Sequence, residues 1–281
     1  MLTTCLKNYQ NNMKTIKKYL KQIFKLFLFR IIIVQLLRNK LINRRFKNLF
    51  ELKGMHYIYK SKIKVFNAKE DSVTRDLCIF GIPQKEKKIF DRFIFEVSNA
   101  KSFLDIGAGI GLYTLFAHEH NKNIQTLSVE PNPKVFNTLN KNLNNISPTR
   151  KSPETLNKVV STKRGSIEFF IPTGDDFSYA TSKKSLLIEK NISHKSMFVE
   201  TTNLSSYENN NFEIIKIDVE GTEVDVLKAI SFHLENCSFL FIEILYKNRI
   251  EIFELLKKYN LQPIVESDDD VGNFVFKKQH I

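Results

Sequence analysis

Cysteine is scarce in this 281-residue sequence: Cys5, Cys78 and Cys237 lie far apart. None of them belongs to a CxxC or CxxH pair. An odd number of isolated cysteines argues against a disulfide framework and against a zinc site, and a reducing cytosol is the expected compartment. The spacing of the remaining His, Asp and Glu residues compels no metal site either, so none is predicted.

The chain also lacks a long uninterrupted apolar run. A membrane-spanning helix needs about 20 mostly apolar residues, but residues 19–40 are interrupted by Lys21, Lys25 and Arg30. The polar residues 38–40 follow the apolar run, whereas a secretory signal has a small-residue cleavage site at that place. Two interpretations remain: a helix packed on the domain behind it, or an interfacial helix held on anionic lipid by its apolar side and its bases.

Acidic residues are almost absent from the first 64 positions. That segment holds 16 Lys and Arg against one acid, Glu51, a net charge of +15, while the rest holds 27 bases against 29 acids. A uniformly basic nucleic-acid binder has a different distribution. We therefore predict a basic, partly amphipathic helical extension at 1–64 and one domain at 65–281, large enough to bury its own core.

Strand and helix patterns alternate from about residue 100 onward. This alternation predicts an α/β fold whose mostly parallel sheet is covered by helices on both faces. A hairpin arm is expected between 157–162 and 166–172. The expected sheet strands are 102–107, 124–130, 157–162, the run that begins at 214, 238–245 and two closing strands, and the expected helices are 112–120, the stretch ending at 143, the run after Gly221 and 249–259.

Four acids fall at the carboxyl ends of expected strands: Asp105, Glu130, Asp218 and Glu243. Ligands of parallel sheets bind outside these strand ends. Several acids on one edge are costly to desolvate unless a positively charged or hydrogen-bond-donating ligand meets them. The four acids together therefore predict a ligand site.

Glycines in "DIGAGIG" indicate the kind of ligand. Gly107, Gly109 and Gly111 form a GxGxG turn between a strand and a helix, but Leu112 stands where the dinucleotide fingerprint has its third glycine. Glu130 ends the next strand about 20 residues on, the spacing of an acid that binds ribose hydroxyls. The GxxxxGK[ST] motif is absent. An adenosine ligand without phosphates is indicated, S-adenosylmethionine above all, because its ammonium and sulfonium charges would meet the acids.

The chain resembles the FkbM-type S-adenosylmethionine-dependent methyltransferases. The resemblance covers about residues 100 to 245 and is carried by "FLDIGAGIGLYT", "VEPNP", "VVST", "IIKIDVEGTEVDVLKAI" and "FLFIEI" in that order. It implies a Rossmann-like class I methyltransferase fold with a seven-stranded sheet. It also implies methyl transfer to a hydroxyl group, often on a sugar of a glycan or on a small natural product.

Matching positions carry over the family's site residues. Asp105, Gly107, Gly109 and Gly111 would form the cofactor loop, and Glu130 would hold the ribose. Asp218 would face the methionine end of the cofactor and the methyl-transfer site. Many relatives have Asn at the position of Gly109, a difference that should not harm cofactor binding.

The acids of "DVEGTE" are given different roles. Asp218 is the first candidate for the base that accepts the hydroxyl proton. For Glu220, a structural role and a role in substrate binding are equally expected. Glu223 is expected to be structural, because acids stabilise the first turn of a helix. Glu243 is a candidate for the wall of the site.

Other candidate bases are weaker. His194 and Tyr179 lie in a polar insert that matches nothing in the family. His118 and His120 sit late in an expected helix and are assigned to structure.

Three other functions are compatible with parts of the sequence. An RNA methyltransferase could use the basic N-terminus, although "DVEG" replaces the [DN]PP[YF] strand end common in enzymes that methylate base amines. A nicotinamide oxidoreductase is disfavoured by Leu112, and a binding module without catalysis stays open. The favoured expectation is a cytoplasmic O-methyltransferase for a glycan or glycolipid hydroxyl, with membrane contact on the cytoplasmic face if residues 1–64 form the interfacial helix.

Overall fold

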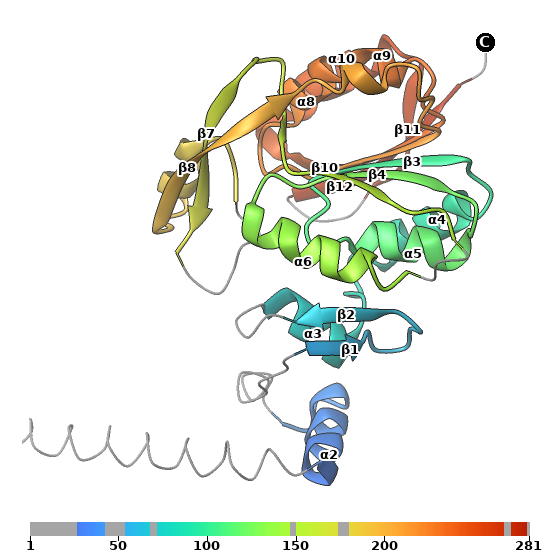
Figure 1. The fold of residues 1–281 in the computed structure, drawn as a ribbon, viewed down its shortest axis with the longest axis vertical. Helices are drawn as coiled ribbons and strands as arrows, with labels where there is room; N and C mark the ends of the chain where they lie inside the picture. The colour runs from blue at the N-terminus through green and yellow to red at the C-terminus, as the bar shows by residue number, and fades with distance from the viewer. Residues whose placement is uncertain are drawn as a thin grey trace, which may run out of the picture.

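A seven-stranded sheet lies at the centre of the computed structural model, which describes residues 27–42, 54–67, 72–146, 150–173, 180–266 and 271–279 (Figure 1). The strand order is β11-β12-β10-β9-β3-β4-β5. Within it, β12 runs antiparallel to both β10 and β11, and the other neighbours are parallel. The strands are β3 (Ser102–Ile106), β4 (Gln125–Val129), β5 (Glu154–Leu156), β9 (Ile214–Ile217), β10 (Phe239–Leu245), β11 (Leu261–Glu266) and β12 (Val271–Lys278).

Helices cover both faces of this sheet (Figure 1). On one face lie α4 (Lys87–Val97), α5 (Leu112–His120) and α6 (Pro133–Leu143), and on the other lie α8 (Glu223–Ala229), α9 (Ser231–Leu234) and α10 (Arg249–Lys257). Short 3-10 turns are η2 (Ser205–Tyr207) and η3 (Tyr246–Asn248). The predicted α/β fold with a mostly parallel seven-stranded sheet is confirmed.

Alternate side chains of the central strands enter two separate cores. Phe103 packs with α4 and α5 on one face, whereas Leu104 packs with α8 and α10 on the other. Both side chains are fully buried. A strand buried on both faces has no polar alternation, which explains the nearly continuous apolar runs of β3 and β9.

The third sheet strand was predicted wrongly. The prediction counted residues 157–162 as the third strand of the sheet, but the third strand is β5, and β6 (Val159–Val160) pairs in parallel with β8 (His194–Thr202) outside that sheet. β7 (Ser166–Pro172) was expected to form a hairpin with residues 157–162, but it pairs antiparallel with β8 instead. These three strands form a separate sheet, here called the arm, and α7 (Lys184–Glu189) lies between β7 and β8 in the sequence.

The described N-terminal elements are two helices and a hairpin. They are α2 (Phe27–Arg38), α3 (Ser72–Phe80) and the antiparallel pair β1 (Gly54–Tyr57) and β2 (Lys64–Asn67). The division predicted at residue 64 thus falls within β2, and residues 54–57 are strand where helix was expected. Among the described residues, every helix is too short or too polar to cross a membrane.

Candidate active site

A cavity of about 430 Å³ opens at the carboxyl ends of β3, β4, β9 and β10. The glycine turn after β3 and the loops after β4 and β9 form much of its wall. Glu130, Asp218 and Glu243 line it, as do Glu220 and the unpredicted Lys216. The sheet edge chosen from the sequence is therefore the edge that carries the cavity.

The glycine turn is held tightly against the end of β9. Gly107 has φ +76°, and a Cβ there would lie 1.8 Å from the Asp218 carbonyl oxygen. Gly111 has φ +85°, and its Cβ would lie 2.6 Å from Leu139 Cδ1. At Gly109 (φ +57°) a Cβ would meet nothing within 4 Å, so this residue faces open space in the cavity wall. The first and third glycines are needed for close approach, and the second for its backbone conformation.

Glu130 ties the glycine turn to the end of β4. Its Oε2 accepts a hydrogen bond from the Gly109 N–H at 2.9 Å, and its Oε1 accepts one from the Asn132 N–H at 2.8 Å. Burial raises the pKa of Glu130 to about 7, although both hydrogen bonds act in the opposite direction. Each oxygen keeps a second lone pair, so the carboxylate can still accept hydrogen bonds from hydroxyl groups in the cavity.

Lys216 is the main charged residue that the sequence reasoning missed. Its Nζ lies 3.1 Å from Asp218 Oδ2 and 4.6 Å from the centre of the Tyr113 ring. Burial lowers the pKa of Lys216, but the charges of Asp218 and Asp105 outweigh burial and leave the pKa above its ordinary value. The signal in the sequence was a lone lysine among the buried isoleucines of β9.

Asp105 lies behind the glycine turn and does not line the cavity. Its side chain is fully buried, and its Oδ2 accepts a hydrogen bond from Thr114 Oγ1 at 2.9 Å. Burial raises the pKa of Asp105, with Lys216 acting against that rise. Asp105 thus links β3 to α5 and adds negative charge behind Lys216, and its place in the cofactor loop stays a prediction.

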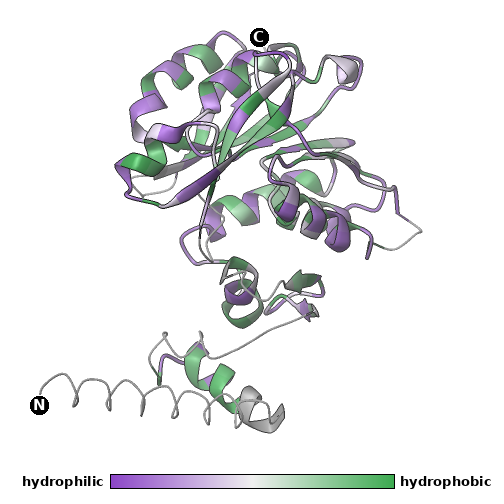
Figure 2. Cartoon of the chain, turned by 60° about the vertical axis from the view of Figure 1, so that its left-hand side comes forward, coloured by the Kyte–Doolittle hydropathy of each residue, from purple (hydrophilic) through white to green (hydrophobic). Residues whose placement is uncertain are grey.

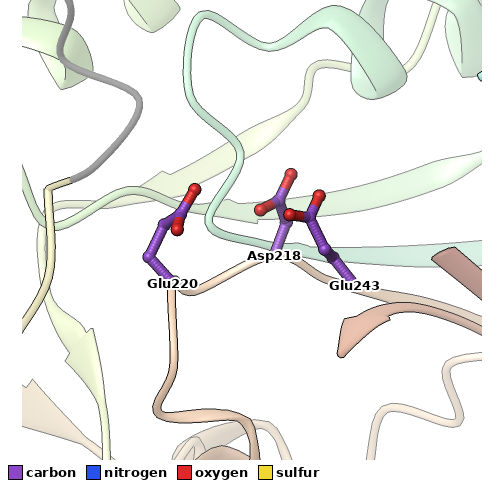
Figure 3. Close-up of side chains that lie close together, drawn as sticks. All are labelled: Asp218, Glu220 and Glu243. Carbon is purple, nitrogen blue, oxygen red and sulfur yellow. The ribbon is translucent and has the colours of Figure 1, made fainter. Parts of the chain in front are cut away.

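Three acids meet at the ends of β9 and β10. Asp218, Glu220 and Glu243 each offer a carboxylate oxygen within 4.8 Å of the others (Figure 3). Burial, together with the charges of Asp218 and Glu220, raises the pKa of Glu243 to about 8. Such a donor set suits a hard metal cation or an organic cation. The spacing of these acids in the sequence did not show that they form one close cluster, because they follow two strands, β9 and β10, that are neighbours only in the sheet.

Glu223 has a structural role, as expected. It is buried, its Oε1 accepts a hydrogen bond from the Gly221 N–H at 2.6 Å, and its Oε2 accepts one from Asn248 Nδ2 at 2.8 Å. Gly221 has φ +95°, and a Cβ there would lie 2.3 Å from Leu186 Cδ1. The loop after β9 is thus fixed on both sides, which holds Asp218 and Glu220 at the cavity.

The predicted histidines lie away from the cavity. His194 Nδ1 lies 3.0 Å from the Ile192 carbonyl oxygen, and the ring packs edge-on against Phe170. His118 is buried with its Nε2 2.9 Å from Thr126 Oγ1, and His120 Nδ1 contacts the Phe116 carbonyl. Tyr179 lies outside the described residues.

Much of the remaining wall of the cavity comes from the arm with its following residues and from α3. The arm and the residues after β7 contribute Lys158, Val159, Val160, Phe169, Ala180 and Ser182. Helix α3 contributes Val73 and Leu77. A second ligand next to the glycine turn would therefore contact the arm and α3.

A family model described as the methyltransferase FkbM domain matches residues 105–262, more than half of the chain. No curated protein sequence matches. A crystal structure of methyltransferase FkbM from Methylobacillus flagellatus KT is 14% identical, with a TM-score of 0.45 over 63% of this chain and 43% of its own, so this chain spans less than half of that protein. Magnesium protoporphyrin IX methyltransferase from Synechocystis PCC 6803, solved with bound S-adenosylmethionine, is 8% identical, with a TM-score of 0.45 over 89% of this chain and 96% of its own.

Proposed function

Because the chain belongs to the FkbM family of S-adenosylmethionine-dependent methyltransferases, we propose that it methylates a hydroxyl group of a sugar in a glycan or glycolipid. One observation carries the proposal: the glycine turn and the carboxylates of Asp218, Glu220 and Glu243 share a single cavity. That arrangement brings a cofactor turn and candidate proton acceptors to the same place.

The residues of the cavity suit the cofactor. Gly109 leaves open space beside the turn, and Glu130 offers lone pairs to ribose hydroxyls. Asp218 and Glu220 supply negative charge for a ligand that carries an ammonium and a sulfonium group, and Glu243 can ionise when that ligand binds. The cofactor supplies an electrophilic methyl carbon when it is bound.

Asp218 is the proposed proton acceptor. The Asp218 carboxylate would accept the proton of the acceptor hydroxyl, while the bound cofactor would supply the methyl group. Lys216 holds that carboxylate by its contact with Oδ2. The rest of the cavity acts by positioning, which brings reacting atoms to about 3–3.5 Å and excludes water.

The charge of the cavity also favours some acceptors over others. Asp218 and Glu220 would repel a phosphate or carboxylate beside the methyl group. A neutral sugar hydroxyl carries no such penalty. This charge distribution supports a glycan acceptor over a nucleic acid.

Calorimetry and a transfer assay test the proposal. The purified full chain should bind S-adenosylmethionine and S-adenosylhomocysteine but not NAD. Glu130→Ala should weaken that binding by ~1.5–3 kcal/mol for each charge-assisted hydrogen bond lost. Radiolabelled methyl transfer should reach neutral oligosaccharides and glycolipid extracts but not RNA. NAD binding without S-adenosylmethionine binding, or transfer to RNA alone, would contradict the proposal.

A further inference from the structure

The N-terminal elements are joined into one surface. Helix α2 packs on α3 through Leu37 and Ile79, which are 4% and 2% exposed. Arg38 Nε donates a hydrogen bond to the Ile79 carbonyl at 2.6 Å, and its guanidinium lies 3.5 Å from the centre of the Tyr59 ring. Because Tyr59 lies between β1 and β2, the end of α2 and the hairpin are held together. We call residues 27–42 and 54–67, which contain α2 and the β1–β2 hairpin, the basic docking surface.

This surface carries positive charge without internal compensation. Residues 27–42 and 54–67 contain six Lys and Arg and no Asp or Glu. Its exposed lysines are Lys40, Lys60, Lys62 and Lys64. Lysines that find no acid within their own elements favour a negatively charged partner.

Large apolar side chains lie exposed among these bases. Ile32 is 55% exposed, Leu41 69% and Tyr57 57%. Ile32 lies about 140° around the helix from the buried Leu37, and so on the other side of α2. Figure 2 shows α2 as a mostly hydrophobic helix at the end of the molecule remote from the sheet. Aliphatic side chains, a tyrosine and lysines together are typical of proteins that lie at a membrane interface.

We propose that the basic docking surface binds the anionic face of a lipid bilayer without crossing it. Each Lys or Arg near such a surface adds favourable attraction, and the apolar side chains can enter the headgroup region. Surfaces that bind RNA stack bases on exposed aromatic rings. Tyr57 is the one exposed ring among the three apolar side chains, whereas Ile32 and Leu41 offer no ring for stacking. Two aliphatic side chains among lysines fit a bilayer better than RNA.

Helix α3 connects the docking surface to the cavity. Val73 and Leu77 line the cavity, whereas Ile79, two residues further on, packs against α2. A single helix therefore contacts both the docking surface and the cavity. A lipid-linked sugar as the acceptor follows from this placement and rests on the proposed function, whereas membrane binding itself does not.

Vesicle flotation of the full chain tests the proposal. The protein should float with vesicles of phosphatidylcholine and phosphatidylglycerol, should stay behind with phosphatidylcholine alone, and should be released at least in part by 1 M salt. Ile32→Glu with Leu41→Glu, and separately Lys62→Glu with Lys64→Glu, should each reduce binding roughly tenfold or more. Ile250→Glu is the matched control, because Ile250 is 82% exposed on α10 and far along the chain from the docking surface.

Each outcome decides the question. If the full chain stays behind with both vesicles, or if both double variants float as well as the parent, the proposal is wrong. Salt-sensitive binding to single-stranded RNA in place of vesicles would assign the surface to nucleic acid and would also overturn it. Thermal unfolding and S-adenosylmethionine calorimetry on the same variants show that they are folded. Flotation tests membrane binding, and calorimetry tests cofactor binding, on which the proposed function depends. Either proposal can therefore fail while the other stands.

Discussion

The Lys216 ammonium lies 3.1 Å from the Asp218 carboxylate, with both side chains at the wall of the cavity. Asp105 adds a second negative charge from behind the glycine turn. The lysine is therefore the positive centre between two acids of neighbouring strands. It holds Asp218 in place and compensates negative charge that would otherwise be costly to bury.

Replacing Lys216 by Met should lower both stability and turnover. Lys216 is buried, whereas the Asp218 side chain is 37% exposed. Removing the lysine leaves the fully buried Asp105 without its compensating charge, so we expect the free energy of unfolding to fall by ~1–3 kcal/mol. Urea unfolding measures this change, and Lys122→Met, at an exposed position, is the control. Adding Asp218→Asn to Lys216→Met should recover part of the lost stability. Strict additivity in this double-mutant cycle would show that the pair is not coupled.

Asp218→Asn and Glu223→Gln should differ in their effects. Asp218→Asn removes the proton acceptor while keeping the shape, so turnover should fall ~10²–10⁴-fold with a much smaller loss of cofactor affinity. Glu223→Gln keeps an acceptor for the Gly221 N–H, so activity should stay near that of the parent. Steady-state kinetics and calorimetry separate the two effects. Equal loss of turnover in two folded variants would show that the division of roles is wrong.

Glu243 should make stability depend on pH. Its pKa is about 8 in the folded chain against an ordinary value of 4.5. Between these values the folded chain binds more protons than the unfolded chain, so the free energy of unfolding falls as pH rises through this range. We expect a loss on the order of 1–3 kcal/mol. Glu243→Gln should flatten this dependence in thermal unfolding, whereas Glu208→Gln, at an exposed position, should not.

Cofactor binding should release a proton from the same residue. A positively charged ligand beside Glu243 favours its ionised form and so lowers its pKa. At pH 7.5 binding should therefore release a fraction of a proton, measured by calorimetry in buffers of different ionisation enthalpy. The release should be smaller in Glu243→Gln. Identical heats in all buffers for the parent protein would show that the positive charge of the cofactor does not reach Glu243.

Gly107→Ala and Gly109→Ala form a matched pair. A Cβ at Gly107 would lie 1.8 Å from the Asp218 carbonyl oxygen, so the turn must shift and cofactor binding should be lost. A Cβ at Gly109 meets open space, and its cost is the left-handed backbone alone, ~1–2 kcal/mol. Gly109→Asn should cost less, because Asn adopts that backbone more readily. Calorimetry with S-adenosylmethionine ranks the three variants, and an active Gly107→Ala would contradict this geometry.

The sequence predicted the centre of the sheet well because β3, β4 and β9 are buried on both faces. An apolar run such as Ile214–Ile217 leaves little doubt about a strand, and the acids Glu130, Asp218 and Glu243 followed from the ends of such runs. Lys216 was missed because its partners lie outside the apolar pattern, one of them on another strand. For Asp105, spacing could not tell a carboxylate at the wall from one behind it.

The arm was predicted poorly for a related reason. Its pairing joins β6 to β8, which is separated from it by β7 and α7. Local periodicity carries no information about a partner that is some 40 residues away. The exposed and half-buried side chains of β8 also gave no continuous apolar run.

The two walls of the cavity belong to different stretches of the chain. Residues 106–113 and 129–138 supply the side with the glycine turn, whereas the arm supplies much of the opposite side. The arm packs mostly around its own apolar cluster of Val159, Phe169 and Val199, while Val160 belongs to the core of the sheet on the side of α8. We therefore expect that exchanging the arm between relatives, with Val160 kept, changes acceptor preference more than it changes cofactor affinity.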